Sequence, residues 1–262
     1  MFISKFQTNE LIKTLTHGIA VYETIRTYNG KPFAMLEHYK RLKKSLSYLA
    51  IDPPKFSEFE ELILESISHT LSNKAYIDQR IRIIYAYDGK LISYVSLEDL
   101  ENIGEREADY VKIDITHIRR ADPSSMPPDL KSLGRPDIYL ARLTKGDNYD
   151  VIMLGSRGQV CEGTFSNLFL IKDRKIVTPS IESGILDGIT RMYAIKFFKE
   201  IGWQVEERFV ELKELYESDE AFLTHTSRGI VPVNSIGKIE KKSAELSREF
   251  SVRFEEYIKC LL

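Results

Sequence analysis

The chain has 262 residues, of which 43 % are hydrophobic and 29 % charged, and this is an ordinary globular composition. Lysine plus arginine number 37 and aspartate plus glutamate 39, and the net charge of −2 argues against a dedicated nucleic-acid-binding protein, which usually has a basic excess. No apolar run approaches the roughly 18 residues of a membrane-spanning helix, and the N-terminus lacks the pattern of a secretory signal, so we expect no membrane association and a cytoplasmic location.

The first half of the chain is expected to combine hairpins with amphipathic helices. The dipeptides Asn29-Gly30 and Asp88-Gly89 predict two hairpins, because both sequences favour tight hairpin turns. The predicted strands of these hairpins span residues 20–27, 31–35, 79–87 and 91–97. Apolar residues at helical spacing predict helices over 36–51 and 56–71, and a further strand is expected over 110–118.

A change of composition separates two predicted domains. Residues 119–130, RRADPSSMPPDL, are rich in proline, serine and charge, which disfavours a regular element and indicates a linker. We therefore expect a small N-terminal domain over 1–118 and a larger C-terminal domain over 131–262.

The second half is predicted to contain short strands grouped between helices. The strands are expected at 151–154, 158–161, 167–171 and 175–178. The helices are expected near 133–144, 191–201, 212–218 and 243–261. Because strands and helices are grouped and do not alternate strictly, the pattern predicts an α+β fold.

Cysteine and histidine spacing argues against two kinds of site. Cys161 and Cys260 lie far apart without a CxxC pair, and the five histidines show no HExxH spacing. We therefore expect neither a disulfide scaffold nor a metal site.

The segment from Gly184 to Thr190 could bind an anion. Two glycines form a turn that opens an amphipathic helix, and free amides at a helix start attract anions. The alternative is an ordinary helix start capped by Asp187 or Thr190. Spacing alone favours the ordinary helix start.

Three charged residues also allow two interpretations each. Glu162 follows a short strand and is either an exposed turn residue or a buried acid with a cationic partner. Lys131 follows a proline-rich stretch; most lysines are solvated, but one whose charge is suppressed can form a Schiff base with a carbonyl. Arg41 lies in a basic helix, either on a solvated face or turned inward to hold a phosphate.

The joint order of six motifs is more informative than any one of them. The series VYETIR, HYKRL, LKSL, EGTFSN, LDGITR and LTHTSRG resembles the fold-type IV pyridoxal-phosphate enzymes, or class IV aminotransferases, from about Gly18 to Val233. This family includes branched-chain and D-amino-acid aminotransferases and aminodeoxychorismate lyases. The resemblance implies a two-domain, D-amino-acid-aminotransferase-like α+β fold, with a small N-terminal α/β domain and a larger C-terminal domain whose mixed sheet is barrel-like. It also implies pyridoxal 5'-phosphate as the cofactor.

The resemblance also assigns roles at the cofactor. Lys131 matches the lysine that forms a Schiff base with the cofactor aldehyde and then carries protons at the substrate α carbon. Glu162 matches the acid facing the pyridine nitrogen, and Leu186 the residue packed on the ring face. Asn167 shares the motif of Glu162, but its role is open. The phosphate ligands that the resemblance implies are Arg41, Ile189, Thr190 and Thr226.

Substrate residues are implied in the same way. Tyr22 resembles the aromatic residue of the substrate pocket, and Thr226 with Ser227 matches the turn that approaches the substrate carboxylate. Arg82 falls near an arginine that can meet a second carboxylate. His17 stands where the family often places a residue from the neighbouring subunit, which implies a homodimer with a shared active site.

These matches predict a ping-pong transaminase. The expected substrates are a branched-chain L-amino acid or a D-amino acid and a 2-keto acid such as 2-oxoglutarate or pyruvate. A lyase acting on 4-amino-4-deoxychorismate is the alternative; Glu23 argues against it, because the lyases commonly have threonine there. A non-catalytic protein that kept the scaffold is a third possibility, and the joint presence of the cofactor residues argues against it. Pro136 stands where branched-chain enzymes commonly have tyrosine, so the substrate carboxylate site is not of a standard type.

Overall fold

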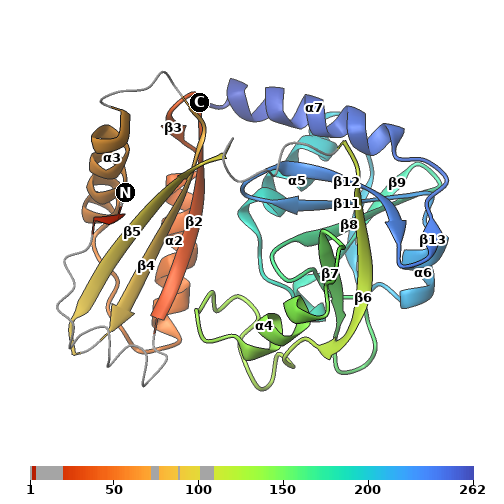
Figure 1. Cartoon of the computed structure of the whole chain (residues 1–262), viewed down its shortest axis with the longest axis horizontal. Coiled ribbons are helices and arrows are strands. Elements are labelled where there is room, and N and C mark those ends of the chain that lie inside the picture. Colours follow the sequence, from red (N-terminus) through yellow and green to blue (C-terminus); the bar gives the residue numbers. More distant parts are fainter. Residues whose placement is uncertain (1, 4–19, 72–76, 88, 101–108) are drawn as a thin grey trace. The chain divides into compact units, whose positions relative to one another are not determined.

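The computed structural model describes residues 2–3, 20–71, 77–87, 89–100 and 109–262, and the chain forms two compact units (Figure 1). The first unit comprises Met1–Arg106 with Asp129–Gly134, and the second Glu107–Pro128 with Arg135–Leu262. This division differs from the expected domain boundaries in two places. The strand predicted over 110–118 pairs within the sheet of the second unit, and the segment carrying Lys131 returns to the first unit.

The described residues of the first unit form an antiparallel sheet and two helices. Its strand order is β1-β5-β4-β2-β3 (Figure 1). The strands are β1 (Phe2–Ile3), β2 (Ala20–Tyr28), β3 (Lys31–Pro32), β4 (Gln79–Tyr87) and β5 (Leu91–Asp99). The helices are α2 (Met35–Ser47), which packs against β2, and α3 (Phe56–Leu71), which packs against β5. Both predicted helices and both predicted hairpins are therefore present.

The turn between β2 and β3 has the backbone that its sequence predicts. Asn29 and Gly30 have φ of 51° and 76°, in the left-handed region that these two residues tolerate best. The Asn29 N–H donates to Asp78 Oδ1 at 2.8 Å, and Arg26 binds the other oxygen of Asp78 at 3.1 Å. One carboxylate thus fixes both the turn and the strand that leads into it.

The second unit contains an eight-stranded mixed sheet. Its order is β10-β9-β8-β11-β12-β6-β7, with β13 paired to β12. The strands are β6 (Val111–Arg119), β7 (Asp150–Leu154), β8 (Asn167–Lys172), β9 (Lys175–Pro179), β10 (Val205–Arg208), β11 (Glu220–His225), β12 (Gly229–Ile236) and β13 (Ile239–Glu240). The pairs β9–β10, β6–β12 and β6–β7 are parallel, and the other pairs are antiparallel.

Helices and aromatic side chains cover the sheet of the second unit. The helices are α4 (Pro136–Leu143), α5 (Ile189–Glu200), α6 (Leu212–Glu217) and α7 (Glu245–Cys260), with a 3-10 turn η2 (Ile181–Ser183) before α5. α5 packs against β11, and α7 packs against β11 and β12. The rings of Phe169 and Phe222 stack across β8 and β11 at 4.9 Å, and Phe198 of α5 contacts Phe250 of α7 at 5.0 Å. None of the helices that the structure describes is long and apolar enough to cross a membrane.

The α+β prediction is confirmed, with differences in the strands of the second half. Residues 158–161 form only an isolated bridge, Leu154 to Val160, and no strand. β10, β11 and β12 were not predicted. All six residues of β11 are buried, so it lacks the alternation of buried and exposed residues that identifies a strand in a sequence.

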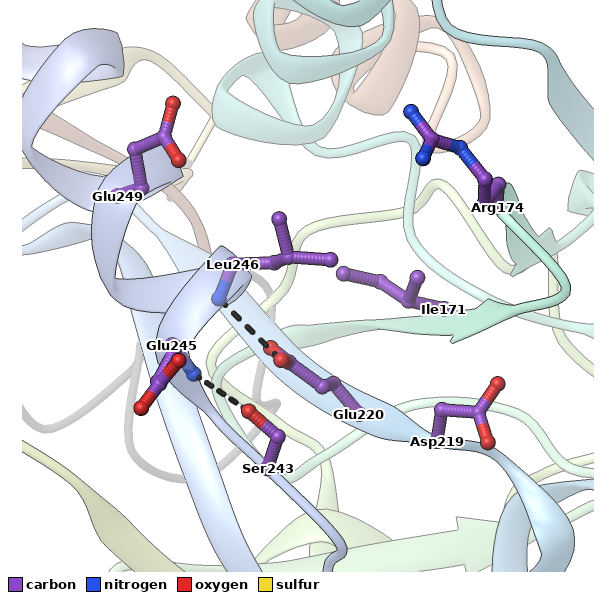
Figure 2. Close-up of a pocket in the computed structure, with 8 residues that line it drawn as sticks. All are labelled: Ile171, Arg174, Asp219, Glu220, Ser243, Glu245, Leu246 and Glu249. Atoms are coloured by element: carbon purple, nitrogen blue, oxygen red, sulfur yellow. Dashed lines mark hydrogen bonds between the residues drawn. The ribbon is translucent and has the colours of Figure 1, made fainter.

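The N-terminus of α7 is capped by a side chain from β11. Glu220 is buried, and its carboxylate accepts a hydrogen bond from the Leu246 N–H at 3.2 Å (Figure 2). It accepts another from the Ser247 N–H at 2.8 Å. The Ser247 hydroxyl donates a third bond at 2.6 Å. An acid at this position satisfies free helix amides and complements the helix dipole.

We expect Glu220→Ala to lower the free energy of unfolding by about 2 kcal/mol, because the helix amides lose their acceptor. Glu220→Gln keeps one acceptor oxygen and should cost about half as much. The control is Glu249→Ala on the same helix, an exposed residue paired with Arg253, which should cost under about 0.5 kcal/mol. Urea unfolding measures all three, and equal losses for Glu220 and Glu249 would contradict the capping role.

Candidate active site

The backbone around Lys131 is fixed to the first unit on both sides. The Lys131 carbonyl accepts the Tyr22 N–H at 3.0 Å, and the Leu133 N–H donates to the Ala20 carbonyl at 3.0 Å. The Lys131 N–H donates to Ser45 Oγ of α2 at 3.1 Å. The segment thus lies against β2 like a short extra strand, and its lysine is held at a defined position.

The side chain of Lys131 lies at Tyr22 without a hydrogen-bond partner. Its Nζ is 4.6 Å from the centroid of the Tyr22 ring, and no described residue forms a hydrogen bond or ion pair with this nitrogen. The Arg82 guanidinium is 5.8 Å from the same ring, and its buried Nε has no partner among the described residues. Two cationic groups at one ring, neither paired with a described carboxylate, favour the binding of an anion. The structure therefore brings together three of the predicted residues.

A buried ion pair lies on the inner face of α2. Arg41 donates from Nε and Nη2 to the two oxygens of Glu23 at 2.8 and 2.6 Å, and His38 Nδ1 lies 2.7 Å from Glu23 Oε2. Burial alone would raise the pKa of Glu23, but the charge and hydrogen bonds of Arg41, with the bond from His38, lower it to about 2. Burial lowers the pKa of His38. Arg41 is thus turned inward, whereas its predicted bond to a phosphate stays a prediction.

In the second unit, Glu162 is a buried carboxylate with three donors. Arg120 Nε donates to Oε1 at 2.9 Å, while Asn167 Nδ2 and the Leu186 N–H donate to Oε2 at 3.0 and 2.9 Å. The surface interpretation of Glu162 is therefore wrong, and the buried acid with a cationic partner is correct. The guanidinium of Arg120 balances the charge, which keeps a carboxylate tolerable in the interior.

Arg120 and Asn167 have roles that the sequence left unassigned. Arg120 lies inside the predicted linker and was given no role there, yet it is buried and contacts Glu162. Asn167 bridges Glu162 and the Leu186 carbonyl, to which its Nδ2 also donates at 3.0 Å. The one signal for Arg120 was its place two residues after the end of the strand predicted over 110–118.

The N-terminus of α5 is left without a side-chain cap. Gly188 is the cap residue, and neither a capping side chain nor an acid in the first turn is present there among the described residues. A Cβ at Gly188 would come within 2.0 Å of Asn167 Oδ1, so a larger residue would displace the asparagine. The predicted cap by Asp187 or Thr190 is therefore wrong, and the amides at Ile189 and Thr190 are placed to bind an anion.

The turn after β11 lies at the same end of the sheet. β11 pairs with β8 so that Thr224 is opposite Asn167, and Thr226 and Ser227 follow directly after β11. Thr224 Oγ1 is buried and has no partner among the described residues. The second unit thus gathers a buried acid, an uncapped helix start and a hydroxyl-bearing turn, which together fit the ring nitrogen and the phosphate of pyridoxal phosphate.

Three further points concern His17, a recess on the second unit and possible metal ligands. His17 lies outside the described residues. A recess on the second unit lies at the other end of β8, beside Ile171, and its buried acid Glu220 is occupied in capping α7 (Figure 2). Among the described residues, no three histidine, cysteine, aspartate or glutamate side chains are grouped so as to hold a metal ion.

Known proteins resemble this chain over most of its length. The family model for class IV amino-transferases matches residues 20–236. A probable branched-chain-amino-acid aminotransferase of Thermotoga maritima is 41 % identical over 249 residues, covering 91 % of this chain and 86 % of that protein. An aminodeoxychorismate lyase of Bacillus subtilis is 29 % identical over 268 residues, covering 94 % and 88 %. A crystal structure of a putative branched-chain amino acid aminotransferase from Thermotoga maritima has a TM-score of 0.87 at 40 % identity, covering 98 % of this chain and 91 % of that one.

We expect Glu23→Gln to lower the free energy of unfolding at pH 7 by about 3 kcal/mol, because the buried Arg41 guanidinium loses the negative charge of the carboxylate to which it donates two hydrogen bonds. The folded pKa of Glu23 is about 2 against an ordinary 4.5. The stabilisation is therefore complete above pH 4.5 and is lost as the pH falls through about 2. The difference in free energy of unfolding between wild type and Glu23→Gln should therefore decrease as the pH is lowered from 4.5 to 2. Urea unfolding followed by circular dichroism measures this difference.

The matched control is Glu98→Gln, which removes a half-exposed acid paired with Arg80 on the same sheet. It should change stability by less than about 0.5 kcal/mol at either pH. A gap for Glu23→Gln that stays constant down to pH 2 would show that its ion pair is not the source of the stability.

Proposed function

The chain belongs to the class IV aminotransferase family, and from this premise we propose which residues and substrates this pyridoxal-phosphate-dependent transaminase uses. The donor is a branched-chain L-amino acid or a D-amino acid, and the acceptor is a 2-keto acid such as 2-oxoglutarate or pyruvate. The observation that carries the proposal is Lys131 Nζ, which has no described partner and lies against Tyr22. A lysine held in this way is available for covalent chemistry with a carbonyl.

The cofactor residues are those that the family motifs indicate. When bound, pyridoxal phosphate supplies an aldehyde that condenses with amines and a ring that withdraws electrons from the reacting carbon. Lys131 would hold the cofactor through its amine and, when that amine is free, would move the proton at the substrate α carbon. Glu162 would keep the ring nitrogen protonated, and Leu186 would contact the ring.

The phosphate would be held at one end of the second unit's sheet. The α5 amides at Ile189 and Thr190 lack a cap among the described residues, which supports this assignment. Thr226 adds a hydroxyl from the neighbouring turn. Arg41 is assigned to the phosphate by the family motif, and its two bonds to Glu23 fix the plane of its guanidinium.

Substrate binding would use the sheet face around Tyr22. Arg82 lies 5.8 Å from the Tyr22 ring and has no carboxylate partner among the described residues, so it can receive the second carboxylate of an acceptor such as 2-oxoglutarate. Ser227 and Thr226 offer their turn to the α-carboxylate. The names of the 41 % identical relative and of the superposed structure support branched-chain donors.

The lyase on aminodeoxychorismate is the second candidate, and the Bacillus subtilis relative favours it. The ion pair of Glu23 argues against it. With threonine at this position, as the lyases commonly have, Arg41 would lose both carboxylate bonds that it makes here. Pyruvate release from aminodeoxychorismate, compared with amino transfer to 2-oxoglutarate, distinguishes the two activities.

A homodimer with a shared active site is also proposed. Tyr139, Leu140 and Leu143 of α4 and Phe165 are exposed apolar side chains of the second unit, and such residues are common where subunits meet. The expected contribution of His17 from the neighbouring subunit and the cytoplasmic location stay predictions.

We expect Lys131→Ala to reduce transaminase turnover by about 10³-fold or more, because the variant lacks the amine that would move the α proton. Borohydride should fix pyridoxal phosphate to wild-type protein at Lys131, detected by peptide mass spectrometry, and not to the variant. Lys213→Ala, an exposed lysine of α6, serves as the control and should keep full turnover. Full turnover of Lys131→Ala would contradict the assignment.

We expect Arg82→Met to raise the KM for 2-oxoglutarate by about 10-fold or more while the KM for pyruvate changes little, since only the longer acid has a second carboxylate. Arg80→Met on the same strand, where the arginine is paired with Glu98, should affect neither acceptor. Steady-state kinetics with both acceptors measures the difference. An equal loss for the two acceptors would show that Arg82 does not read the second carboxylate.

A further inference from the structure

Asp150 is a buried acid that the steps above do not use. It begins β7 in the second unit, is completely buried, and forms no ion pair with any residue that the structure describes. Oδ1 accepts hydrogen bonds from the Val151 N–H at 2.8 Å, the Thr164 N–H at 2.9 Å and Thr164 Oγ1 at 2.7 Å. Ser166 Oγ donates to Oδ2 at 2.7 Å. Since burial of an unpaired carboxylate is costly, these donors are what makes its position tolerable.

Three of the four donors come from one short turn. Thr164 and Ser166 belong to residues 163–166, which connect Glu162 with Asn167. The Gly163 N–H donates to the Ser166 carbonyl at 2.8 Å and closes the turn. A Cβ at Gly163 would come within 2.1 Å of Asp150 Oδ2 and 2.3 Å of Ser166 Oγ. The glycine, threonine and serine of EGTFSN are therefore explained by a turn wrapped closely around one carboxylate.

The ends of this turn carry the two residues that meet at the candidate active site. The Glu162 carbonyl accepts the Met153 N–H of β7 at 2.9 Å, so the backbone before the turn is fixed to the same strand as Asp150. Asn167 begins β8 after the turn, and its amide returns to Glu162 Oε2 at 3.0 Å. The shape of the turn thus sets how these two side chains converge.

We propose that Asp150 is a positioning residue for transamination, which holds the turn through Thr164 and Ser166 and so directs Glu162 toward the ring nitrogen of pyridoxal phosphate. This inference rests on the proposed function. Asp150 itself touches neither cofactor nor substrate in this role. Burial raises the pKa of Asp150, and the hydrogen bonds from Ser166 and Thr164 oppose that rise. The donors that shape the turn therefore also stabilise the ionised form of this acid.

The test removes the donors one at a time. Ser166→Ala and Thr164→Val should each raise the Kd for pyridoxal phosphate by about 10-fold and alter the visible circular dichroism of the bound cofactor. The matched control is Thr178→Val, because Thr178 is completely buried in the same sheet and donates to the Leu168 carbonyl at 2.8 Å, and so makes no bond to Asp150 or to residues 163–166. It should lower stability to a similar extent and leave Kd and spectrum unchanged.

Substitution of the acid itself completes the series. In Asp150→Asn the amide oxygen can accept from Thr164 and the amide nitrogen can donate to Ser166 Oγ, so cofactor Kd should stay near the wild-type value. Asp150→Ala, compared at a temperature where it remains folded, should bind the cofactor more weakly than Asp150→Asn. If Asp150→Ala does not fold, the Ser166 and Thr164 variants decide alone.

The outcomes separate this inference from the function on which it rests. Wild-type protein that takes up no pyridoxal phosphate would contradict the proposed function. Wild-type protein that binds it, with Ser166→Ala and Thr164→Val binding equally well, would overturn the role of Asp150 alone. A change of Kd in Thr178→Val as large as in Ser166→Ala would also overturn it, because a general loss of stability would then account for both.

Discussion

A carboxylate buried away from water is stable only when a cation or several hydrogen-bond donors contact it. The candidate functional residues of this chain are arranged around three such buried carboxylates. Glu23 is met by Arg41 and His38, so its strand and helix α2 are fixed to one another. Glu162 is met by Arg120 and Asn167. Asp150 forms no ion pair with a described residue and instead accepts hydrogen bonds from the backbone and hydroxyls of a turn. Most of these partners belong to the family motifs, and Arg120 is the exception.

The local patterns of the first unit predicted its two hairpins and the helices α2 and α3, whereas the two-residue strand β1 was not predicted. Its helices are amphipathic and its Asn29-Gly30 turn dictates its own backbone, so each element is specified by nearby residues. The second unit is different, because β11 and most of β12 are buried on both faces and show no periodic signal. β6 was correctly predicted as a strand, but it was assigned to the N-terminal domain and lies in the second unit. Its parallel pairing with β12 joins residues more than a hundred positions apart, which no local pattern indicates.

The candidate site shows a similar division between what local sequence can indicate and what only folding reveals. Lys131 and Glu162 were found because their motifs occur in a characteristic order. Arg120 was hidden in a proline-rich segment, where nothing nearby indicated that its charge would be buried against an acid 42 residues later. The ion pair of Arg41 with Glu23 was not predictable either, because the helix and the strand that carry these residues meet only in the folded unit. Polar contacts between residues far apart in the sequence are set by tertiary packing, and local secondary-structure propensity does not indicate them.

The close approach of Gly163 to Asp150 has a consequence for the history of this family. Because a Cβ at 163 would overlap the carboxylate, the glycine can be replaced without a clash only after the acid has given way to something smaller. If the glycine is replaced first, the new Cβ overlaps the carboxylate oxygen of Asp150. Substitution at these two positions therefore has a preferred order: loss of the acid beside a retained glycine creates no clash, whereas a descendant that lacks Gly163 should also lack Asp150.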